Sequence, residues 1–405
     1  MIDRLGQSLF LPTILFGFAF FAAENISRLP SDAIILLSYL PYASLLLVAL
    51  IASAFNRGRS LIAATFGLVL LSVDQYRADI PFVEAIALIL FPVNLATLAF
   101  LPERGTLTTA GIMRVTLVFA QIVATLFLLN RFGLQAEPYL FFTALPSWPE
   151  YLNQSQPAAF VALIALLITL GASSVSQSPV THSLFSASAG FAALLLFHLP
   201  ETTTQVFLIA VAIALSVGLM RDYYNMAYRD ELTSLPQRRA LNESLTALSG
   251  QYCIAMLDVD HFKKFNDTHG HDVGDQVLQM VASQIRKVQG GGKAYRYGGE
   301  EFTVVFSGKQ IDDAVYFLEE VRKSIEGYEM VIRESERPVE AEDKSSQKSR
   351  EKGSYRKADK KVSVTISIGV AEKSKGETPE EVLKRSDEAL YKAKKGGRNR
   401  VSSHS

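Results

Sequence analysis

The chain has 405 residues, enough for two or three domains, and its 40 Lys and Arg residues balance its 40 Asp and Glu residues. A zero net charge gives no overall basic field, so we expect no nucleic-acid partner. The average hides a split, because no lysine occurs before Lys263 and the rest of the chain is rich in charged residues. The single cysteine, Cys253, excludes an intramolecular disulfide framework and suits a reducing compartment for the second half.

Eight apolar runs occupy most of residues 1–220. They are Leu9–Ala23, Ala33–Phe55, Leu61–Val73, Ile80–Leu101, Ile112–Leu129, Ala158–Leu170, Leu184–Leu199 and Val206–Met220. A helix needs about 20 apolar residues to cross a bilayer, and the third, sixth and seventh runs are short for this. The pattern predicts an all-α, polytopic membrane domain of about eight helices, with seven or six as alternatives. A cleaved signal peptide is another interpretation of the first run, which Arg4 and Ala22-Ala23 permit.

The arginines that flank these runs predict the orientation. If the N-terminus starts in the cytoplasm, the segments on that side hold Arg4, Arg57, Arg59, Arg104 and Arg221. The opposite segments hold Arg28, Arg77 and Arg131. Basic residues concentrate on the cytoplasmic side of membrane proteins. We therefore expect a multi-pass membrane protein, in contact with the lipid bilayer, with both ends in the cytoplasm. A cleaved signal followed by seven spans would also leave the C-terminus inside.

Two amide side chains lie deep in the apolar runs, Asn94 in the fourth and Gln121 in the fifth. Amides at that depth either line a ligand cavity or bridge helices by hydrogen bonds, and we expect the second. Few ionisable residues lie deep in the runs and no internal repeat is visible, which argues against an ion-coupled transporter. No motif identifies the signal that this domain would sense.

Residues 221–229 join the two halves. No glycine or proline interrupts the chain between Gly218 and Leu235, so the last apolar run is predicted to continue as one helix into a short cytoplasmic stalk. A continuous helix is stiffer than a Gly/Ser-rich linker. Rotation or sliding of the membrane helix would therefore reach the soluble domain at residues 230–405.

The soluble half has the pattern of alternating strands and helices. Tyr252–Leu257 is typical of a buried strand and ends in Asp258-Val259-Asp260. Apolar residues recur with helical spacing from Val273 to Val288, which places Asp275 in the first turn of that helix. The remaining elements are strands at Ala294–Tyr297, Phe302–Phe306 and Val362–Ala371 and helices at Ile311–Ile325 and Thr378–Lys395. The last helix is predicted to open with a capping box at Thr378-Pro379-Glu380-Glu381. This order predicts an α+β domain of ferredoxin-like or polymerase-palm type, a mixed sheet with helices packed on it.

A tight turn at Gly298-Gly299-Glu300-Glu301 separates two of these strands. The glycines free the backbone at the tip and leave room for a ligand. The predicted sheet brings this turn beside Asp258, so three carboxylates can converge. Hard oxygen ligands of this kind suit Mg²⁺ or Mn²⁺.

Other polar side chains could complete a nucleotide site around these carboxylates. Lys263, Lys394 and Arg398 supply positive charge of the kind that binds a triphosphate. Asn266 and Asp275 offer an amide and a carboxylate, which together can bind the edge of guanine. Each residue alone is an ordinary turn or helix-start residue, but the combination predicts a nucleotide-polymerising palm.

Residues 230–401 resemble the GGDEF-domain diguanylate cyclases. The resemblance rests on the segments Asp230–Leu235, Asp258–Asp267, Gly270–Asp275, Arg296–Phe302, Ser367–Ala371 and Ala389–Arg400. It implies an enzyme that condenses two GTP molecules into cyclic di-GMP and releases pyrophosphate.

The same resemblance implies roles for single residues. The implied metal ligands are Asp258, the Val259 carbonyl, Glu300 and Glu301. The implied catalytic residues are Glu300, as the base, and Lys263, which stabilises charge on the phosphates. The implied substrate-binding residues are Asn266, His271, Asp275, Lys394 and Arg398.

The implied reaction is an in-line attack of the 3′-hydroxyl of one GTP on the α-phosphate of the other. Metal ions lower the pKa of the hydroxyl and offset charge on the leaving pyrophosphate, while lysines add positive charge. Each subunit would hold one GTP, so two subunits must face each other about a two-fold axis. We therefore expect a homodimer, at least transiently.

The chain departs from the family pattern in two places. The family often carries an inhibitory product site, Arg-x-x-Asp, five residues before the Gly-Gly pair. Those positions hold Gly290-Gly291-Gly292-Lys293, so we expect weak or no product inhibition through that site. Residues 334–361 form a highly charged insertion, expected to be a solvated, partly disordered loop. Contact between its basic residues and anionic lipid is an alternative.

Two other functions stay open at this point. One is a catalytically silent domain that binds GTP or a protein partner, and the other is a membrane receptor or transporter with the cyclase as its read-out. The presence of Asp258, Glu300 and Glu301 favours an active enzyme. Asn266 with Asp275 favours GTP over ATP or mixed nucleotides.

Overall fold

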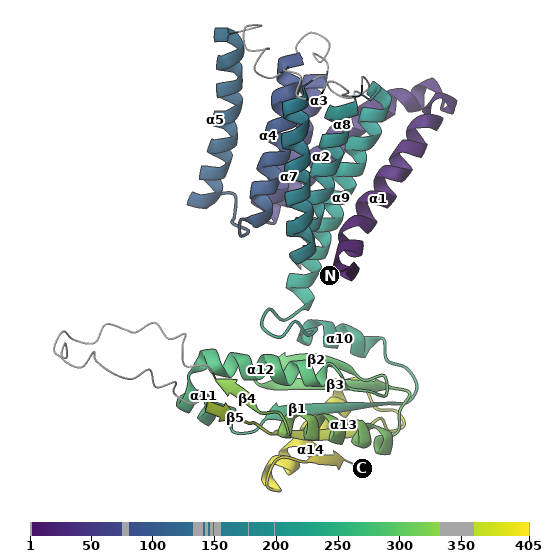
Figure 1. Cartoon of the computed structure of the whole chain (residues 1–405). Helices are drawn as coiled ribbons and strands as arrows, with labels where there is room; N and C mark the ends of the chain where they lie inside the picture. Colours follow the sequence, from purple (N-terminus) through teal and green to yellow (C-terminus); the bar gives the residue numbers. More distant parts are fainter. Residues whose placement is uncertain are drawn as a thin grey trace, which may run out of the picture. The chain divides into compact units, whose positions relative to one another are not determined.

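The computed structural model describes residues 2–74, 81–132, 155–176, 178–197, 199–332 and 360–404, together with the single residues 141, 145 and 149. The chain divides into two compact units, Met1–Tyr223 and Tyr224–Ser405 (Figure 1). The charged insertion predicted at 334–361, including its lipid contact, lies outside the described residues except for its last two positions.

Each of the eight apolar runs forms a helix. The helices are α1 (Ile2–Asn25), α2 (Ser31–Ala54), α3 (Gly58–Asp74), α4 (Pro81–Phe100), α5 (Thr109–Phe132), α7 (Gln156–Val175), α8 (Pro179–Phe197) and α9 (Glu201–Tyr228), and a short 3₁₀ helix, Ile26–Arg28, follows α1. In the described part of the chain, six of them are long and apolar enough to cross a membrane. The apolar segments of α3 and α5, Gly58–Ser72 and Thr109–Thr125, are shorter. The sixth and seventh runs, whose length was predicted to be marginal, therefore form helices (α7 and α8) that are long enough to cross a membrane. The fifth run, in α5, is too short by the same measure, as is the third run, in α3.

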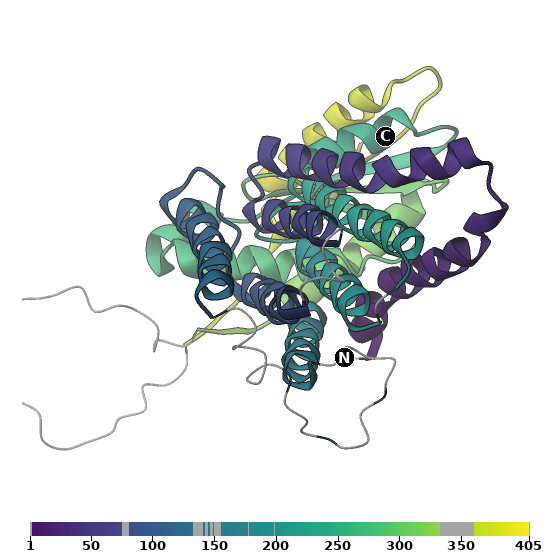
Figure 2. The same cartoon turned by 90° about the horizontal axis from the view of Figure 1, so that it is seen from above.

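Small and polar residues bring the helices of the first unit together. A Cβ atom on Gly218 of α9 would lie 2.5 Å from the Ser183 Cβ of α8, so these helices approach closely. The side chain of Asn94 on α4 donates a hydrogen bond from Nδ2 to Gln121 Oε1 on α5 at 2.8 Å. The amides therefore bridge two helices, as predicted. Both views place α5 at the edge of the bundle, beside α4 (Figures 1 and 2).

The turn between α2 and α3 contacts the C-terminal part of α9. Arg57 forms an ion pair with Asp222 at 3.0 Å, and the ring of Phe55 packs on that of Tyr223 with centroids 4.6 Å apart. Helix α9 continues without a break to Tyr228. The first residues of the predicted stalk are thus continuous with the last apolar helix.

The second unit is built on a five-stranded sheet of order β2-β3-β1-β6-β7. Its strands are β1 (Tyr252–Val259), β2 (Lys293–Gly298), β3 (Glu301–Ser307), β6 (Ile366–Glu372) and β7 (Val401–His404). Only the β6–β7 pair is parallel within this sheet. The mixed sheet with packed helices confirms the predicted fold class.

Helices cover both faces of this sheet. They are α10 (Arg238–Thr246), α11 (Phe262–His269), α12 (His271–Ile285), α13 (Ile311–Glu326) and α14 (Pro379–Lys395). Leu257 and Val259 belong to the apolar core that includes α12 and α13, whereas Ile254 belongs to the core with α10 and α14. Because side chains alternate along a strand, Asp258 lies on the α14 face.

Four details of the second unit differ from the sequence prediction. The predicted strand Val362–Ala371 is split, because β5 (Lys360–Val362) pairs with β4 (Met330–Ile332) in a separate two-stranded sheet. Strand β7, with one apolar residue in Val-Ser-Ser-His, gave no recognisable strand pattern. Helix α12 begins at His271, after Gly270 with φ +85°, so Asp275 lies in the second turn and not the first. The helix α11 before it was not predicted.

Candidate active site

Asp258 is the last but one residue of the buried strand β1 and faces a lysine from α14. Its Oδ2 lies 2.8 Å from Lys394 Nζ, and the residue is only 5 % exposed. Burial raises the pKa of the Asp258 carboxyl, while the Lys394 ammonium and the charge of Arg398 oppose this shift. The strand therefore delivers a carboxylate into a protected position where cations stabilise its charge.

The Gly298-Gly299-Glu300-Glu301 turn lies beside Asp258. Strand β2 ends at Gly298 and β3 begins at Glu301, which confirms the predicted hairpin. Asp258 is the register partner of Glu301, and the Val259 N–H donates to the Glu300 carbonyl at 3.3 Å. Burial raises the pKa of Glu300, the Asp258 and Glu301 charges raise it further, and Lys394 opposes them. Two sequence-distant carboxyl groups are therefore close enough to interact.

The three carboxylates do not form a finished metal cage. Among the residues that the structure describes, no group of three or more His, Cys, Asp or Glu side chains is arranged to hold a metal ion. The Lys394 ammonium instead neutralises Asp258. The residue types fit a hard divalent cation, because Asp258 and Glu301 are register partners and Glu300 is close enough for both charges to raise its pKa.

Arg296 fixes the back of the turn. Its Nη2 donates to the Gly299 carbonyl at 2.8 Å and its Nη1 pairs with Asp230 Oδ2 at 2.6 Å. Burial would raise the pKa of Asp230, but hydrogen bonds from Thr233 and Arg296 outweigh it, so the pKa is lowered. Asp230 follows α9 by two residues, which links the end of that helix to the turn. Sequence reasoning placed these residues in family motifs without assigning them this role.

A second group of predicted residues lies on α11 and α12. Lys263, His271 and Asp275 are exposed, and Asn266 is half-buried. A Cβ atom on Gly274 would lie 1.9 Å from Asn266 Oδ1, so glycine makes room for this amide. Asn266 Oδ1 is buried and has no hydrogen-bond partner among the described residues. An unpaired buried acceptor is costly, which suits a site completed by a ligand donor.

The remaining predicted residues come from the end of α14. The predicted capping box starts this helix at Thr378, whose side chain accepts from the Glu381 N–H. Lys394 lies in its last turn, and the Arg398 N–H donates to the Ala393 carbonyl at 3.0 Å. The structure thus brings Lys394 and Arg398 to the carboxylates. Among the described residues, no hydrogen bond or ion pair joins the side chains of the α11–α12 group to those carboxylates.

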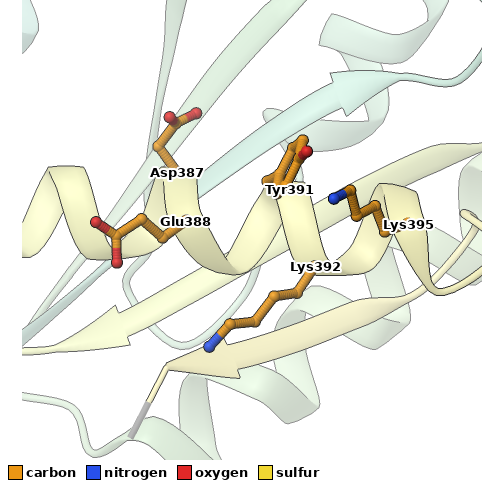
Figure 3. Close-up of a pocket in the computed structure, with 5 residues that line it drawn as sticks. All are labelled: Asp387, Glu388, Tyr391, Lys392 and Lys395. Atoms are coloured by element: carbon orange, nitrogen blue, oxygen red, sulfur yellow. The ribbon is translucent and has the colours of Figure 1, made fainter.

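A surface hollow of about 640 Å³ lies on the outer face of α14 (Figure 3). Its lining residues are Asp387, Glu388, Tyr391, Lys392 and Lys395. None of the predicted site residues lines it. We therefore place the candidate site at the ion pair of Asp258 with Lys394 and not at this open hollow.

Comparison with known protein families identifies the second unit. The family described as "Diguanylate cyclase, GGDEF domain" matches residues 227–343 and 338–400. The chain contains a GGDEF domain. This confirms the identification made from the sequence motifs.

Relatives of the GGDEF domain occur in several bacteria. The diguanylate cyclase VdcA of Vibrio cholerae is 38 % identical over 176 residues, which are 42 % of this chain and 45 % of VdcA. The response regulator PleD of Caulobacter vibrioides is 34 % identical over 188 residues, 44 % of this chain and 36 % of PleD. The chain thus spans less than half the length of either. The crystal structure of the coiled coil and GGDEF domain of DgcB from Caulobacter crescentus is 34 % identical and covers 46 % of this chain and 90 % of that one, with a TM-score of 0.38.

The raised pKa of Glu300 predicts how stability depends on pH without metal. Between the ordinary carboxyl pKa and the raised value, the native state binds more protons than the unfolded chain, so stability falls as pH rises through that window. We expect Glu300→Gln to match or exceed the wild-type Tm at pH 7 in EDTA, with the advantage vanishing near pH 4. Glu320→Gln, at an exposed position of α13, is the control. A lower Tm of Glu300→Gln at pH 7 would contradict this expectation.

Proposed function

We propose that this protein is a membrane-anchored diguanylate cyclase that condenses two GTP molecules into cyclic di-GMP and pyrophosphate. The observation that carries the proposal is the pairing of buried Asp258 with Lys394 beside the turn of Glu300 and Glu301. This arrangement brings acidic and basic side chains together at one end of strand β1 in a GGDEF domain. The relatives named as diguanylate cyclases support the same activity.

The acidic residues would hold Mg²⁺ or, in its place, Mn²⁺. Asp258, the Val259 carbonyl, Glu300 and Glu301 are the proposed ligands. A bound divalent ion would lower the pKa of the attacking 3′-hydroxyl and neutralise charge on the leaving pyrophosphate. Burial and neighbouring carboxylates raise the pKa of Glu300, a direction that suits a group proposed to accept the hydroxyl proton.

The basic residues would bind the triphosphate. Lys394 is already attracted to the acidic edge, and Arg398 is near enough to act on the charge of Asp258. Lys263 is exposed on α11 and is free to reach the phosphates of a bound nucleotide. These side chains stabilise the charge that develops as pyrophosphate leaves.

The guanine base would bind at the α11–α12 group. The Asn266 Oδ1 acceptor is buried without a partner, and guanine offers N–H donors on its edge. Asp275 would accept a second donor, and His271 lies at the start of the same helix. Adenine presents a different pattern of donors, so this pair of acceptors favours GTP.

The product requires two GTP molecules, so the active species would be a homodimer with a substrate in each subunit. The membrane domain would anchor the enzyme in the bacterial inner membrane with the GGDEF domain in the cytoplasm. Six apolar helices and the continuous helix α9 support an anchor that also transmits an unknown signal.

The test is to purify the full chain in detergent, add GTP and Mg²⁺, and measure cyclic di-GMP by mass spectrometry. We expect product with GTP, none with ATP, and none when EDTA replaces Mg²⁺. Bound GTP without any product would favour the catalytically silent alternative. A product formed equally well from ATP would contradict the proposed role of Asn266 and Asp275.

A further inference from the structure

Three consecutive residues after α14 have left-handed backbone conformations. They are Gly397 (φ +110°), Arg398 (φ +63°) and Asn399 (φ +45°). Glycine adopts this region freely and asparagine tolerates it, whereas an arginine there is strained. Such strain persists where surrounding contacts determine the conformation. Contacts around Arg398 must therefore hold it in this conformation.

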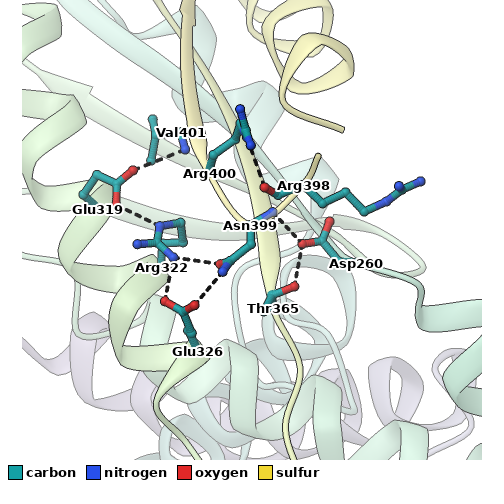
Figure 4. Close-up of polar contacts among 9 residues, drawn as sticks. All are labelled: Asp260, Glu319, Arg322, Glu326, Thr365, Arg398, Asn399, Arg400 and Val401. Atoms are coloured by element: carbon teal, nitrogen blue, oxygen red, sulfur yellow. Dashed lines mark hydrogen bonds and ion pairs between the residues drawn. The ribbon is translucent and has the colours of Figure 1, made fainter. Parts of the chain in front are cut away.

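Asn399 makes three of these contacts (Figure 4). Its backbone N–H donates to Asp260 Oδ2 at 3.0 Å. Its Nδ2 donates to Glu326 Oε1 at 2.6 Å, and its Oδ1 accepts from Arg322 Nη1 at 2.8 Å. One side chain and its own N–H thus tie the end of β1 to the end of α13.

The partners of Asn399 are themselves fixed. Arg322 also pairs with Glu319 at 2.8 Å, and its side chain is 12 % exposed. Asp260 is 6 % exposed and accepts hydrogen bonds from the hydroxyls of Thr365 at 2.7 Å and Ser367 at 2.6 Å. Asp260 is therefore bound by hydroxyl and N–H donors, whereas Asp258, two residues earlier, pairs with the ammonium of Lys394.

Arg398 is held between two anchors. On one side, its N–H donates a hydrogen bond to the Ala393 carbonyl. On the other side, the N–H of the next residue, Asn399, donates to Asp260. Figure 4 shows its guanidinium pointing away from Arg322 and Glu326. Lys394, four residues earlier, is paired with Asp258. The same end of β1 thus fixes both basic residues, Lys394 through Asp258 and Arg398 through Asp260 and Asn399.

We propose that Asn399 is a positioning residue that holds Arg398 in the left-handed conformation from which its guanidinium reaches the phosphates of GTP. This inference rests on the proposed function. Asn399 acts through Arg398 and not by touching the substrate. What holds Arg398 in place is the pair of hydrogen bonds from the Asn399 side chain to α13. The tolerance of asparagine for a positive φ is not sufficient.

The variant Asn399→Gly separates these two contributions, because glycine keeps the backbone conformation and loses both side-chain hydrogen bonds. In the full chain with GTP and Mg²⁺, we expect the KM to rise by roughly 10-fold or more, by analogy with residues that orient a ligand-binding group, with a smaller change in kcat. Arg398→Ala should raise the KM similarly, and the double variant should be no worse than Arg398→Ala alone. Glu320→Gln, on the same helix as Arg322 but outside the network, should match the wild type.

A reversed hydrogen bond provides a rescue. Asn399→Asp places a carboxylate against Glu326 and should raise the KM, and adding Glu326→Gln restores a donor and should lower it again. Unchanged KM in Asn399→Gly, or additive effects with Arg398→Ala, would overturn this inference while leaving the proposed function intact. A wild-type chain that makes no cyclic di-GMP would overturn the proposed function. In that case, amide hydrogen exchange still tests the anchoring role of the Asn399 side chain. If residues 397–401 exchange as slowly in Asn399→Gly as in the wild type, that role is also overturned.

Discussion

Asp258→Asn is expected to reduce cyclic di-GMP synthesis by roughly 100-fold or more, because it removes a charged ligand from the proposed metal site. The substitution keeps the shape of the side chain and removes a charge that burial disfavours, as the raised pKa of Asp258 indicates. Lys394 is 32 % exposed and can be hydrated after losing its partner. We therefore expect a Tm close to that of the wild type, so that the loss reflects chemistry and not unfolding.

The measurement is the initial rate of cyclic di-GMP formation by the full chain, together with GTP binding at equilibrium. Asp387→Asn is the matched control, because Asp387 is an exposed acid on the outer face of α14. We expect Asp258→Asn to retain nucleotide affinity through the residues on α11 and α12. Turnover within a few-fold of the wild type would refute the assignment of Asp258 as a metal ligand.

Gly369→Ala is expected to destabilise the GGDEF domain strongly. A Cβ atom at this position would lie 2.0 Å from the Leu390 backbone nitrogen and 2.2 Å from the Ser386 carbonyl oxygen. Both atoms belong to the backbone of α14, so no side-chain rotation can relieve the overlap and the helix must move off β6. Overpacking of this kind costs about 1–3 kcal/mol, which corresponds to a Tm lower by roughly 2–12 °C for a domain of this size.

The displacement of α14 would also carry Lys394 away from Asp258, so activity should fall even below the new Tm. Differential scanning calorimetry of the full chain measures the first effect and cyclic di-GMP formation the second. Gly299→Ala is the stability control, because a Cβ atom there meets nothing within 4 Å. An unchanged Tm for Gly369→Ala would show that the contact between β6 and α14 is looser than in this structure.

Several elements follow from local sequence signals. The Gly-Gly pair between two apolar runs predicted the hairpin that carries Glu300 and Glu301, and the Thr378–Glu381 pattern predicted the start of α14. The apolar runs predicted the helices of the first unit, because a membrane-crossing helix needs a long apolar stretch that is visible in any window of the sequence. Each of these features depends on residues that are close together in the chain.

The different roles of Asp258 and Asp260 depend on residues far away in the chain. The two side chains have the same chemistry and the spacing of a strand face, so periodicity cannot separate them. Asp258 pairs with Lys394, whereas Asp260 is used by Thr365, Ser367 and the N–H of Asn399, which is 139 positions away. The left-handed conformation of Arg398 is likewise invisible in the sequence, because contacts with β1 and α13 impose it. By itself the sequence determined the family and the class of fold, and it supplied the candidate site residues, since these depend on local pattern and composition. Only the tertiary structure decided that Asp258 pairs with Lys394 and that Asp260 accepts from the loop after α14, because packing between distant segments sets those partners.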